Sequence, residues 1–185
     1  MEKLQSFLEK LEREQNISLE DIPKIDLYMD QVIQLFENKF NGTKRNEDDK
    51  ILTKTMINNY AKGKLLFPIK NKKYSKEHII LISLIYQLKG ALSIKDIQAT
   101  LEGINEKVTE GNFDLDSLYN HYLHNSAENT VSFQEDMQTR IEKSTITDEE
   151  YLSKVLLIAS LVNMSNLYRR AAEKLVDEIV EGKSE

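Results

Sequence analysis

The middle of the chain constrains the fold most, because three short helical patterns follow one another there. Apolar residues recur at three- and four-residue steps in 54–62, 75–89 and 94–101, which is the spacing of an amphipathic helix. Gly63 and Gly90 follow the first two patterns, and glycine commonly ends a helix. The segment therefore predicts three short helices, with a small hairpin between the first and the second.

The helix expected at 54–62 has an apolar side and a polar side that contains no acids. The apolar side carries Met56, Ile57, Tyr60 and Ala61. The polar side carries Lys54, Thr55, Asn58, Asn59 and Lys62. Thr53 is a suitable N-cap for this helix. Amide side chains can pair with the edge of adenine, and lysines attract phosphates or guanine, so the polar side is typical of a helix that contacts DNA.

The residues after Gly63 predict a hairpin whose tip is rich in lysine. The runs 65–69 and 72–74 flank Lys70-Asn71, and asparagine accepts the positive φ of a tight turn. Pro68 restricts its strand to a sheet edge. Two interpretations of the lysines stay open, since they either project toward phosphate groups or protect an exposed edge from aggregation.

Helices are also expected before this segment. An apolar stripe predicts a short surface helix within residues 1–15; it consists of Leu4, Phe7, Leu8 and Leu11. Asp26 can cap a second helix that continues to about Phe40. Residues 41–50 are polar and lack periodicity, so they predict a loop.

The helix expected at 75–89 is apolar almost all round, which predicts a central core element. Ser75 is its expected cap, and Ser93 with Asp96 forms a capping box for a fourth, short helix that ends near Leu101.

The charge of the chain is unevenly distributed. The net charge is −6, yet residues 44–95 contain twelve Lys or Arg and four Asp or Glu, a local excess of +8 that leaves −14 on the rest. A basic segment in an acidic chain is expected where one face meets phosphate groups. The alternative is a chance fluctuation on a solvated surface.

The order of these features resembles the DNA-binding domain of the MerR family of transcription regulators. The matching motifs are Met56-Ile57-Asn58-Asn59-Tyr60, Lys64-Leu65-Leu66, Lys72-Lys73-Tyr74-Ser75 and Gly90-Ala91-Leu92-Ser93-Ile94. The whole chain is also similar to an uncharacterised bacterial family with a MerR-like DNA-binding region, in which helix 26–40 is the first helix of the helix-turn-helix. The resemblance implies a winged helix-turn-helix, DNA binding and a dimer held by the long helix that follows.

The chain departs from that family at the recognition helix, the wing and one loop. Asn58 and Asn59 stand where the family has arginine and tyrosine, and Lys72 replaces an arginine that could make a bidentate contact. About a dozen residues join the first two helices, whereas a helix-turn-helix normally uses three or four. These differences leave a second interpretation open, a MerR-like fold that binds a protein partner without DNA.

Residues 105–185 predict further helices and a dimer contact. A helix over 114–125 would point Leu115, Leu118, Tyr119 and Tyr122 inward. Thr147 and Glu150 form a capping box for a long helix that continues to about Val180, and this helix is either a dimer contact or buried within its own subunit. The expected dimerisation residues are Val155, Leu156, Ile158, Ala159, Val162, Leu167, Ala171, Leu175 and Ile179.

Candidate ligand sites in this second part are weak. His121 and His124 stand three residues apart near acidic residues and could share a metal, but surface histidines are the simpler interpretation. We therefore expect no metal and no cofactor. Four tyrosines could line a cavity for an unidentified small-molecule effector; they are Tyr119, Tyr122, Tyr151 and Tyr168.

Together these features predict a mainly α-helical protein with a winged helix-turn-helix and a small β-hairpin wing in residues 1–104, followed by an all-α dimerisation or effector region in 105–185. The predicted function is a dimeric, sequence-specific transcription regulator that binds double-stranded DNA. The residues expected to face DNA are Thr53, Lys54, Thr55, Asn58, Asn59, Tyr60, Lys62, Lys70, Lys72 and Lys73.

An enzyme is not expected, because no glycine-rich phosphate loop, cysteine nucleophile or pair of catalytic carboxylates is recognisable. The chain contains no cysteine, which fits a reducing cytosol, and its first residues are charged and unlike a signal peptide. No apolar run is long enough to cross a membrane, so we expect a cytoplasmic protein.

Overall fold

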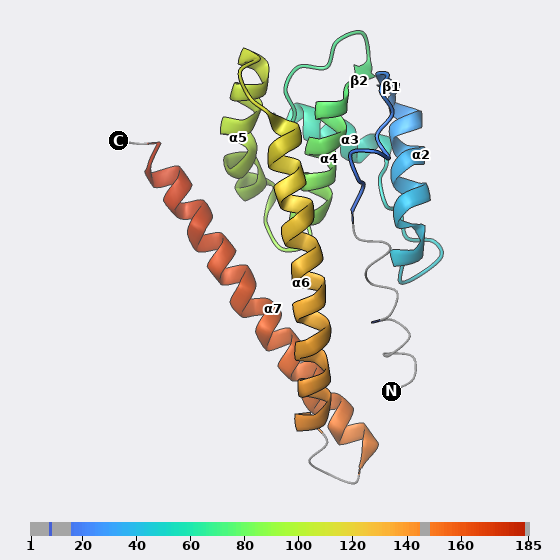
Figure 1. The fold of residues 1–185 in the computed structure, drawn as a ribbon, viewed down its shortest axis with the longest axis vertical. Coiled ribbons are helices and arrows are strands. Elements are labelled where there is room, and N and C mark those ends of the chain that lie inside the picture. Colours follow the sequence, from blue (N-terminus) through green and yellow to red (C-terminus); the bar gives the residue numbers. More distant parts are fainter. Residues whose placement is uncertain (1–7, 9–15, 145–148, 184–185) are drawn as a thin grey trace.

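The computed structural model of the chain describes residue 8 and residues 16–144 and 149–183. It confirms a mainly helical protein with a small antiparallel sheet of two strands (Figure 1). The elements in order are β1 (Leu27–Tyr28), α2 (Met29–Phe40), the 3-10 turn η2 (Asn41–Thr43), α3 (Lys54–Lys62), β2 (Lys73–Tyr74), α4 (Lys76–Leu88), α5 (Ile94–Glu110), α6 (Leu115–Ser144) and α7 (Glu150–Glu181).

Helix α4 lies at the centre of the core, as its nearly uniform apolarity predicted. Ile80, Leu81 and Ile82 are each 0% exposed, so three successive positions on this helix are covered from different directions. Figure 1 shows the other short helices and the upper half of α6 arranged around α4. The hydrophobic core cluster begins at Ile17 and extends to Tyr119, which defines a packed unit in the first two thirds of the chain.

The sheet is not the hairpin that the sequence predicted. Strand β2 pairs with β1, with Leu27 opposite Tyr74 and Tyr28 opposite Lys73, whereas the run 65–69 forms no strand. That run packs into the core instead, since Leu65 is 0% exposed and Leu66 is 6% exposed. The predicted wing is therefore a turn held against the segment that precedes α2.

The tight turn at the tip does form. Asn71 and Lys72 have φ of 51° and 57°, as both central residues of a type I′ turn require. Lys70 and Lys73 pair as an isolated bridge, and the Lys73 N–H donates to the Lys70 carbonyl oxygen at 3.0 Å. The prediction of a turn at Lys70-Asn71 is confirmed within one residue.

Several predicted helix ends are confirmed and others are wrong. The side chain of Thr53 accepts a hydrogen bond from the Met56 N–H at 3.1 Å, and Ser93 and Asp96 form the expected capping box. Asp26 does not cap α2, because residues 27–28 form β1 first and the helix begins at Met29. The fourth helix continues past 101 to Glu110, where Gly111 ends it with φ of 76°.

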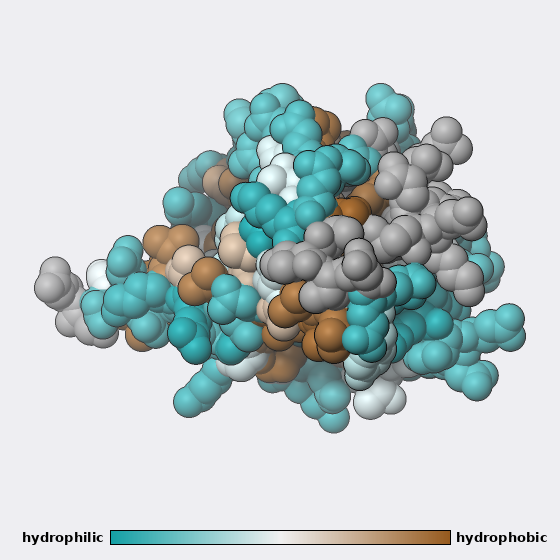
Figure 2. Space-filling view, turned by 90° about the horizontal axis from the view of Figure 1, so that it is seen from below, coloured by the Kyte–Doolittle hydropathy of each residue, from teal (hydrophilic) through white to brown (hydrophobic). Residues whose placement is uncertain are grey.

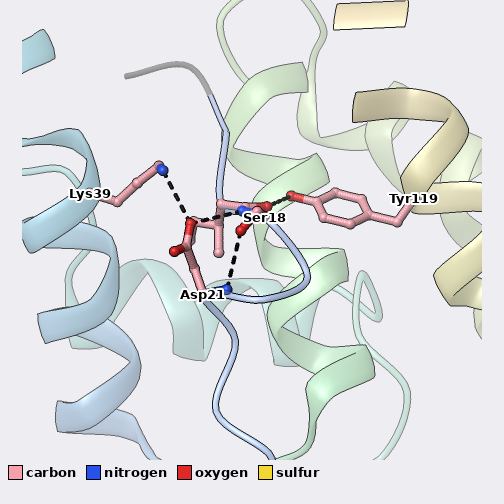
Figure 3. A network of polar contacts seen from close by, with 5 residues as sticks. Ser18, Asp21, Lys39 and Tyr119 are labelled. Atoms are coloured by element: carbon pink, nitrogen blue, oxygen red, sulfur yellow. Dashed lines mark hydrogen bonds and ion pairs between the residues drawn. The ribbon is translucent and has the colours of Figure 1, made fainter. Parts of the chain in front are cut away.

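The segment that enters the core is fixed by a polar network between α2 and α6 (Figure 3). Ser18 and Asp21 exchange hydrogen bonds, Lys39 of α2 pairs with Asp21 at 3.1 Å, and the Tyr119 hydroxyl donates to the Ile17 carbonyl oxygen at 2.8 Å. Burial disfavours the charged form of Asp21, but the hydrogen bonds from Ser18 and Lys39 outweigh it and lower the pKa of that carboxyl.

Two long helices extend from the packed unit. Helix α6 is far longer than the predicted 114–125, and α7 matches the predicted long helix closely. Figure 1 shows α6 and α7 meeting away from the body and separating toward it, so that the C-terminal end of α7 approaches α5. There, the Lys183 ammonium pairs with Glu102 of α5 at 2.7 Å.

Some predictions fall outside the described residues. These include the Thr147 cap and most of the helix expected within 1–15. Leu8 of that helix is described; it is 6% exposed, and its carbonyl oxygen accepts a hydrogen bond from the Gln134 side chain of α6 at 2.8 Å. Across the described ranges, no helix combines the length and the apolarity that crossing a membrane requires.

Candidate nucleic-acid interface

The exposed side of α3 carries a polar stripe without acids. Lys54, Asn58 and Lys62 follow at four-residue steps and are all exposed, which puts them on one face of the helix. Thr55 and Asn59 lie beside them and are also exposed. The opposite side is held in the core by Ile57, which is 0% exposed, so the orientation of the polar stripe is fixed by packing.

Two residues of the predicted DNA-facing set have other roles in this helix. Tyr60 is only 4% exposed, and burial raises the pKa of its hydroxyl, so its ring belongs to the core side of α3. The Thr53 hydroxyl is half-buried and already accepts the Met56 N–H. We therefore leave Tyr60 out of the exposed surface and treat Thr53 as the cap that begins the helix.

The turn after α3 adds a second group of cations. Lys70 and Lys72 are exposed together with Asn71. Lys73 is half-buried, and its ammonium lies over the ring of Tyr28 of β1, 5.3 Å from the ring centroid. An ammonium over an aromatic face is attracted by the ring, which holds this lysine closer to the body than its neighbours.

A hollow joins the helix to the turn. It has a volume of about 520 Å³, and Asn58 of α3 and Lys72 of the turn both line it. The β1–α2 junction contributes Tyr28, Met29 and Asp30 to its wall, and Ile69 and Tyr74 complete it. The amide of the polar stripe and the lysine of the turn therefore face the same space, although they are fourteen positions apart in the sequence.

Most of the exposed lysines of α3 and the turn have no acidic partner among the described residues. Asp30 forms an ion pair with Lys54 at 2.8 Å. Within the described part of the chain, no ion pair is formed by Lys62, Lys70 or Lys72. We define the basic surface as the exposed residues Lys54, Thr55, Asn58, Asn59, Lys62, Lys70, Asn71 and Lys72.

The local charge of +8 overstates this surface, because several cations of residues 44–95 are used elsewhere. Lys44 pairs with Glu37, and Lys76 pairs with Asp116 of α6. Lys89 donates to the Ile51 carbonyl oxygen at 3.3 Å and lies over the Tyr86 ring, and burial lowers the pKa of its ammonium. Charge counting along the sequence could not distinguish these structural lysines from exposed ones.

His78 is a structural residue that the sequence analysis missed. It is 3% exposed, and its Nδ1 accepts the Ser75 N–H at 3.1 Å while its ring stacks on Phe67 with centroids 3.8 Å apart. A backbone N–H can only donate, so Nε2 carries the proton and donates to the Phe67 carbonyl oxygen at 3.2 Å. The neutral imidazole thus ties the segment before the turn to the start of α4, and burial lowers its pKa. The signal for it was a histidine three residues after a capping serine.

The other candidate ligand sites of the sequence analysis do not form clusters. His121 and His124 are exposed on α6, and no group of three or more potential metal ligands occurs among the described residues. Tyr119 and Tyr122 stack in the body with centroids 5.7 Å apart, whereas Tyr151 and Tyr168 are 69% and 71% exposed on α7. The four tyrosines therefore do not line one cavity.

All nine predicted dimerisation residues of α7 are exposed, so the alternative of burial within the same subunit is wrong for them. Ile158 and Leu175 are the most exposed of the large ones, at 62% and 61%. Figure 2 shows hydrophobic residues on the side of the molecule where α7 projects from the body.

Eight of these nine residues, all except Leu156, form two stripes on different sides of α7. Val155, Ile158, Ala159 and Val162 share one side of the first half of the helix. Leu167 comes five residues after Val162, and five residues turn a helix by about 140°. Leu167, Ala171, Leu175 and Ile179 therefore continue along another side. The sequence period alone did not reveal this division.

Comparison with known proteins relates the packed unit to one family. A family model described as "Domain of unknown function (DUF1836)" matches residues 17–122, which is more than half of the chain. No curated protein and no solved structure matches the chain. The matched region begins and ends close to the limits of the hydrophobic core cluster, and it contains the basic surface.

Proposed function

The chain belongs to the DUF1836 family, and we propose that it is a dimeric, sequence-specific DNA-binding regulator of transcription with a MerR-like helix-turn-helix, in which a lysine-bearing turn takes the place of the hairpin wing. The observation that carries this proposal is the shared hollow of Asn58 and Lys72, which joins a helix with an acid-free polar side to a lysine-bearing turn. Amides that can read base edges and cations that can hold phosphates then approach one duplex together.

Helix α3 would enter the major groove with its polar stripe toward the base edges. Asn58 and Asn59 would contact bases, while Lys70 and Lys72 would hold the backbone beside the groove. The Lys54–Asp30 pair lies at the exposed start of α3, with the two side chains 64% and 75% exposed. An exposed pair of this kind is weak, so Lys54 can exchange Asp30 for a phosphate at little cost.

The dimer would form through the exposed stripes of α7. Two-fold dimers are the commonest protein oligomers, and a long helix with exposed apolar residues suits a self-complementary contact. Because the two stripes lie on different sides of the helix, one straight helix pair would bury one of them. Separate charge substitutions, Ile158→Glu and Leu175→Glu, identify the stripe that holds the dimer when molar mass is measured by light scattering.

Titration with genomic DNA fragments at several salt concentrations tests the DNA-binding proposal. We expect affinity to fall with salt, and Lys72→Ala to reduce the slope of log affinity against log salt by about 1. Lys174→Ala removes the same charge from α7, where the side chain is 66% exposed, and should leave the slope unchanged. A protein that binds none of the fragments, with no dependence on salt, would contradict the proposal.

Base reading is tested separately from phosphate binding. Asn58→Ala should cost about 1–3 kcal/mol on the preferred fragment and reduce its preference over unrelated DNA. Asn120→Ala changes an exposed amide of α6 and serves as the control. If Asn58→Ala lost the same affinity for preferred and for unrelated DNA, Asn58 would contact the DNA backbone and not the bases.

The second candidate is a protein-interaction module on the same fold. It is favoured by the two stripes of α7, which together offer more apolar surface than one straight helix pair covers. Affinity purification from cell extract separates the candidates. DNA that co-purifies with the protein and is lost after nuclease treatment supports the regulator. Protein partners that remain bound after nuclease treatment support the interaction module.

A further inference from the structure

The hollow that joins α3 to the turn has an apolar floor. Met29 of α2 and Ile69 line it, and both are half-buried side chains that pack against the hydrophobic core cluster. Ile69 belongs to residues 63–69, the joining segment between α3 and the turn. The rings of Tyr28 and Tyr74 add to the wall. Four of the seven described lining residues are therefore apolar or aromatic.

The backbone around this floor is fixed by the packed unit. Leu65 of the joining segment is 0% exposed, and its carbonyl oxygen accepts a hydrogen bond from the Asn105 side chain of α5 at 3.0 Å. On the other side, Leu27 of β1 pairs with Tyr74 of β2, which fixes the strand that leads into α2. An occupant therefore meets a hollow that is already formed, which lowers the cost of binding.

The charges that reach the hollow have opposite signs and do not select an ion. Asp30 contributes a carboxylate and Lys72 an ammonium, and Asp30 is already paired with Lys54 at 2.8 Å. A phosphate in the hollow would lie near the Asp30 carboxylate, and a cation would lie near the Lys72 ammonium. The neutral amide of Asn58 is the remaining polar group. The hollow therefore suits an uncharged group with an apolar end beside a polar edge.

A thymine in the major groove of DNA presents such a group. Its C5-methyl projects into the groove, and the adenine paired with it presents an acceptor and a donor that an asparagine amide can bind. Placing the methyl against the floor of the hollow removes apolar surface of both partners from water, which is favourable. Uracil differs from thymine only in lacking this methyl, so the two bases isolate its contribution.

We propose that the hollow is a specificity pocket for the methyl group of thymine, at or next to the base pair whose adenine Asn58 contacts. The methyl lies against Ile69, Met29 and the Tyr28 ring, and Lys72 at the rim reaches the flanking phosphate. This inference deepens the proposed function and rests on it, because the hollow meets a base edge only when α3 lies in the major groove. It adds a preference that the Asn58 amide alone does not supply.

Replacing every thymine by uracil tests the inference without knowledge of the target sequence. A genomic fragment that the protein prefers is amplified once with dTTP and once with dUTP, and both products are titrated at the same salt concentration. Loss of one buried methyl group should weaken binding about fourfold, and loss of one in each half-site of a dimer about 16-fold. An unrelated fragment, amplified in the same two ways, should bind equally in both forms.

Variants locate the methyl in the hollow. Ile69→Ser should bring the affinities for the two forms within about twofold of each other, because the methyl then meets a hydroxyl group. Met29→Ser changes the same floor from α2 and should act alike, so a folding failure of one variant leaves the other as a test. Ile25→Ser is the control; Ile25 is 71% exposed and does not line the hollow, so the preference for thymine should remain.

The outcomes separate this inference from the proposed function. Equal affinity of the natural protein for the two forms of the preferred fragment would overturn the inference. A full preference for thymine in a folded Ile69→Ser or Met29→Ser variant would do the same, since the methyl would then lie elsewhere. In both cases binding to DNA still falls with salt, so the proposed function stands. A protein that binds no fragment at any salt concentration overturns both.

Discussion

The packed unit of residues 17–122 and helix α7 contain similar apolar residues but place them in opposite environments. Ile80 of α4 is 0% exposed, whereas Ile158 of α7 is 62% exposed. The hydrophobic core cluster contains buried residues from β1 and from α2 through α6, but none from α7. Of the described residues of α7, only Leu157 and Val176 are buried. The first region thus buries its apolar residues through its own contacts, whereas the second leaves most of its apolar residues exposed.

The two environments suit the two regions to different roles. A tightly packed core keeps the basic surface rigid, because Ile57 and Leu65 fix α3 and the joining segment from within. An exposed apolar helix is instead suited to assembly, since burying its side chains on association is favourable. The family model ends at residue 122, close to the place where the packed unit ends.

The largest difference in stability between the two regions is expected when one isoleucine in each is replaced by alanine. Ile80→Ala should lower the free energy of unfolding by about 2–5 kcal/mol, because it leaves a cavity in a closed core. Ile158→Ala should change it by no more than about 0.5 kcal/mol when measured at low protein concentration. Urea unfolding followed by circular dichroism provides both values. Similar losses would show that α7 is part of the core in solution.

The second test concerns the buried histidine that ties the packed unit together. His78→Gln should cost about 1–3 kcal/mol at neutral pH, because the Ser75 N–H and the Phe67 carbonyl oxygen lose well-placed partners. Burial lowers the pKa of His78 in the folded protein, although its contact with Phe67 and the charges of Glu77 and Asp26 oppose this.

The sign of its pH dependence follows from that lowered pKa. The unfolded chain binds a proton at a pKa of about 6.5. The folded state binds it only at lower pH, so stability is lost as the pH falls below about 6.5. Urea titrations between pH 7.5 and 5 should show this loss in the natural protein and a smaller one in His78→Gln. An unchanged slope in the variant would mean that His78 is not buried in its neutral form.

The third test compares two tyrosines, one from each region. Tyr119→Phe removes a hydrogen bond to the Ile17 carbonyl oxygen and should cost about 1 kcal/mol, whereas Tyr151→Phe on α7 should have no measurable effect. Burial also raises the pKa of Tyr119 to about 12. The stability that this hydroxyl contributes is therefore present below pH 10 and lost as the pH rises toward 12. Burial also raises the pKa of Tyr60, Tyr74 and Tyr122, so absorbance at the phenolate band should show several late-titrating groups, of which Tyr119→Phe removes one.

The sequence predicted the features of the fold that depend on neighbouring residues. The N-cap at Thr53, the capping box at Ser93 and the turn at Lys70-Asn71 each need only a few adjacent positions. The central place of α4 followed from its apolar composition. In the candidate site, the exposure of Asn58 and Lys62 followed from the division of a short helix into two sides.

Features that depend on distant residues were missed. The β1–β2 pairing joins Leu27 to Tyr74, and strands of two residues carry no alternation that a sequence pattern could reveal. The length of α5 was underestimated because Gly103 interrupts the pattern, although Ile104 and Val108 beyond it pack against the core. The hydrogen bonds of Asn105 depend on carbonyl groups that only the folded chain brings to it.

The smallest effect on stability is expected at the contact between Lys183, just after α7, and Glu102 of α5. Lys183 donates a hydrogen bond to Glu102. This hydrogen bond and the positive charge of Lys183 lower the pKa of the Glu102 carboxyl. Lys183→Ala should therefore raise the pKa of Glu102 toward its ordinary value, which a carboxyl NMR titration can measure, while Lys174→Ala should not. Because both partners are well exposed, the change in overall stability should be the least of the four tests. Hydrogen exchange in the last turns of α7 should nevertheless become faster, since this contact ties the end of the helix to α5. If both the pKa and the exchange rates are unchanged, α7 is held to the packed unit through α6 alone.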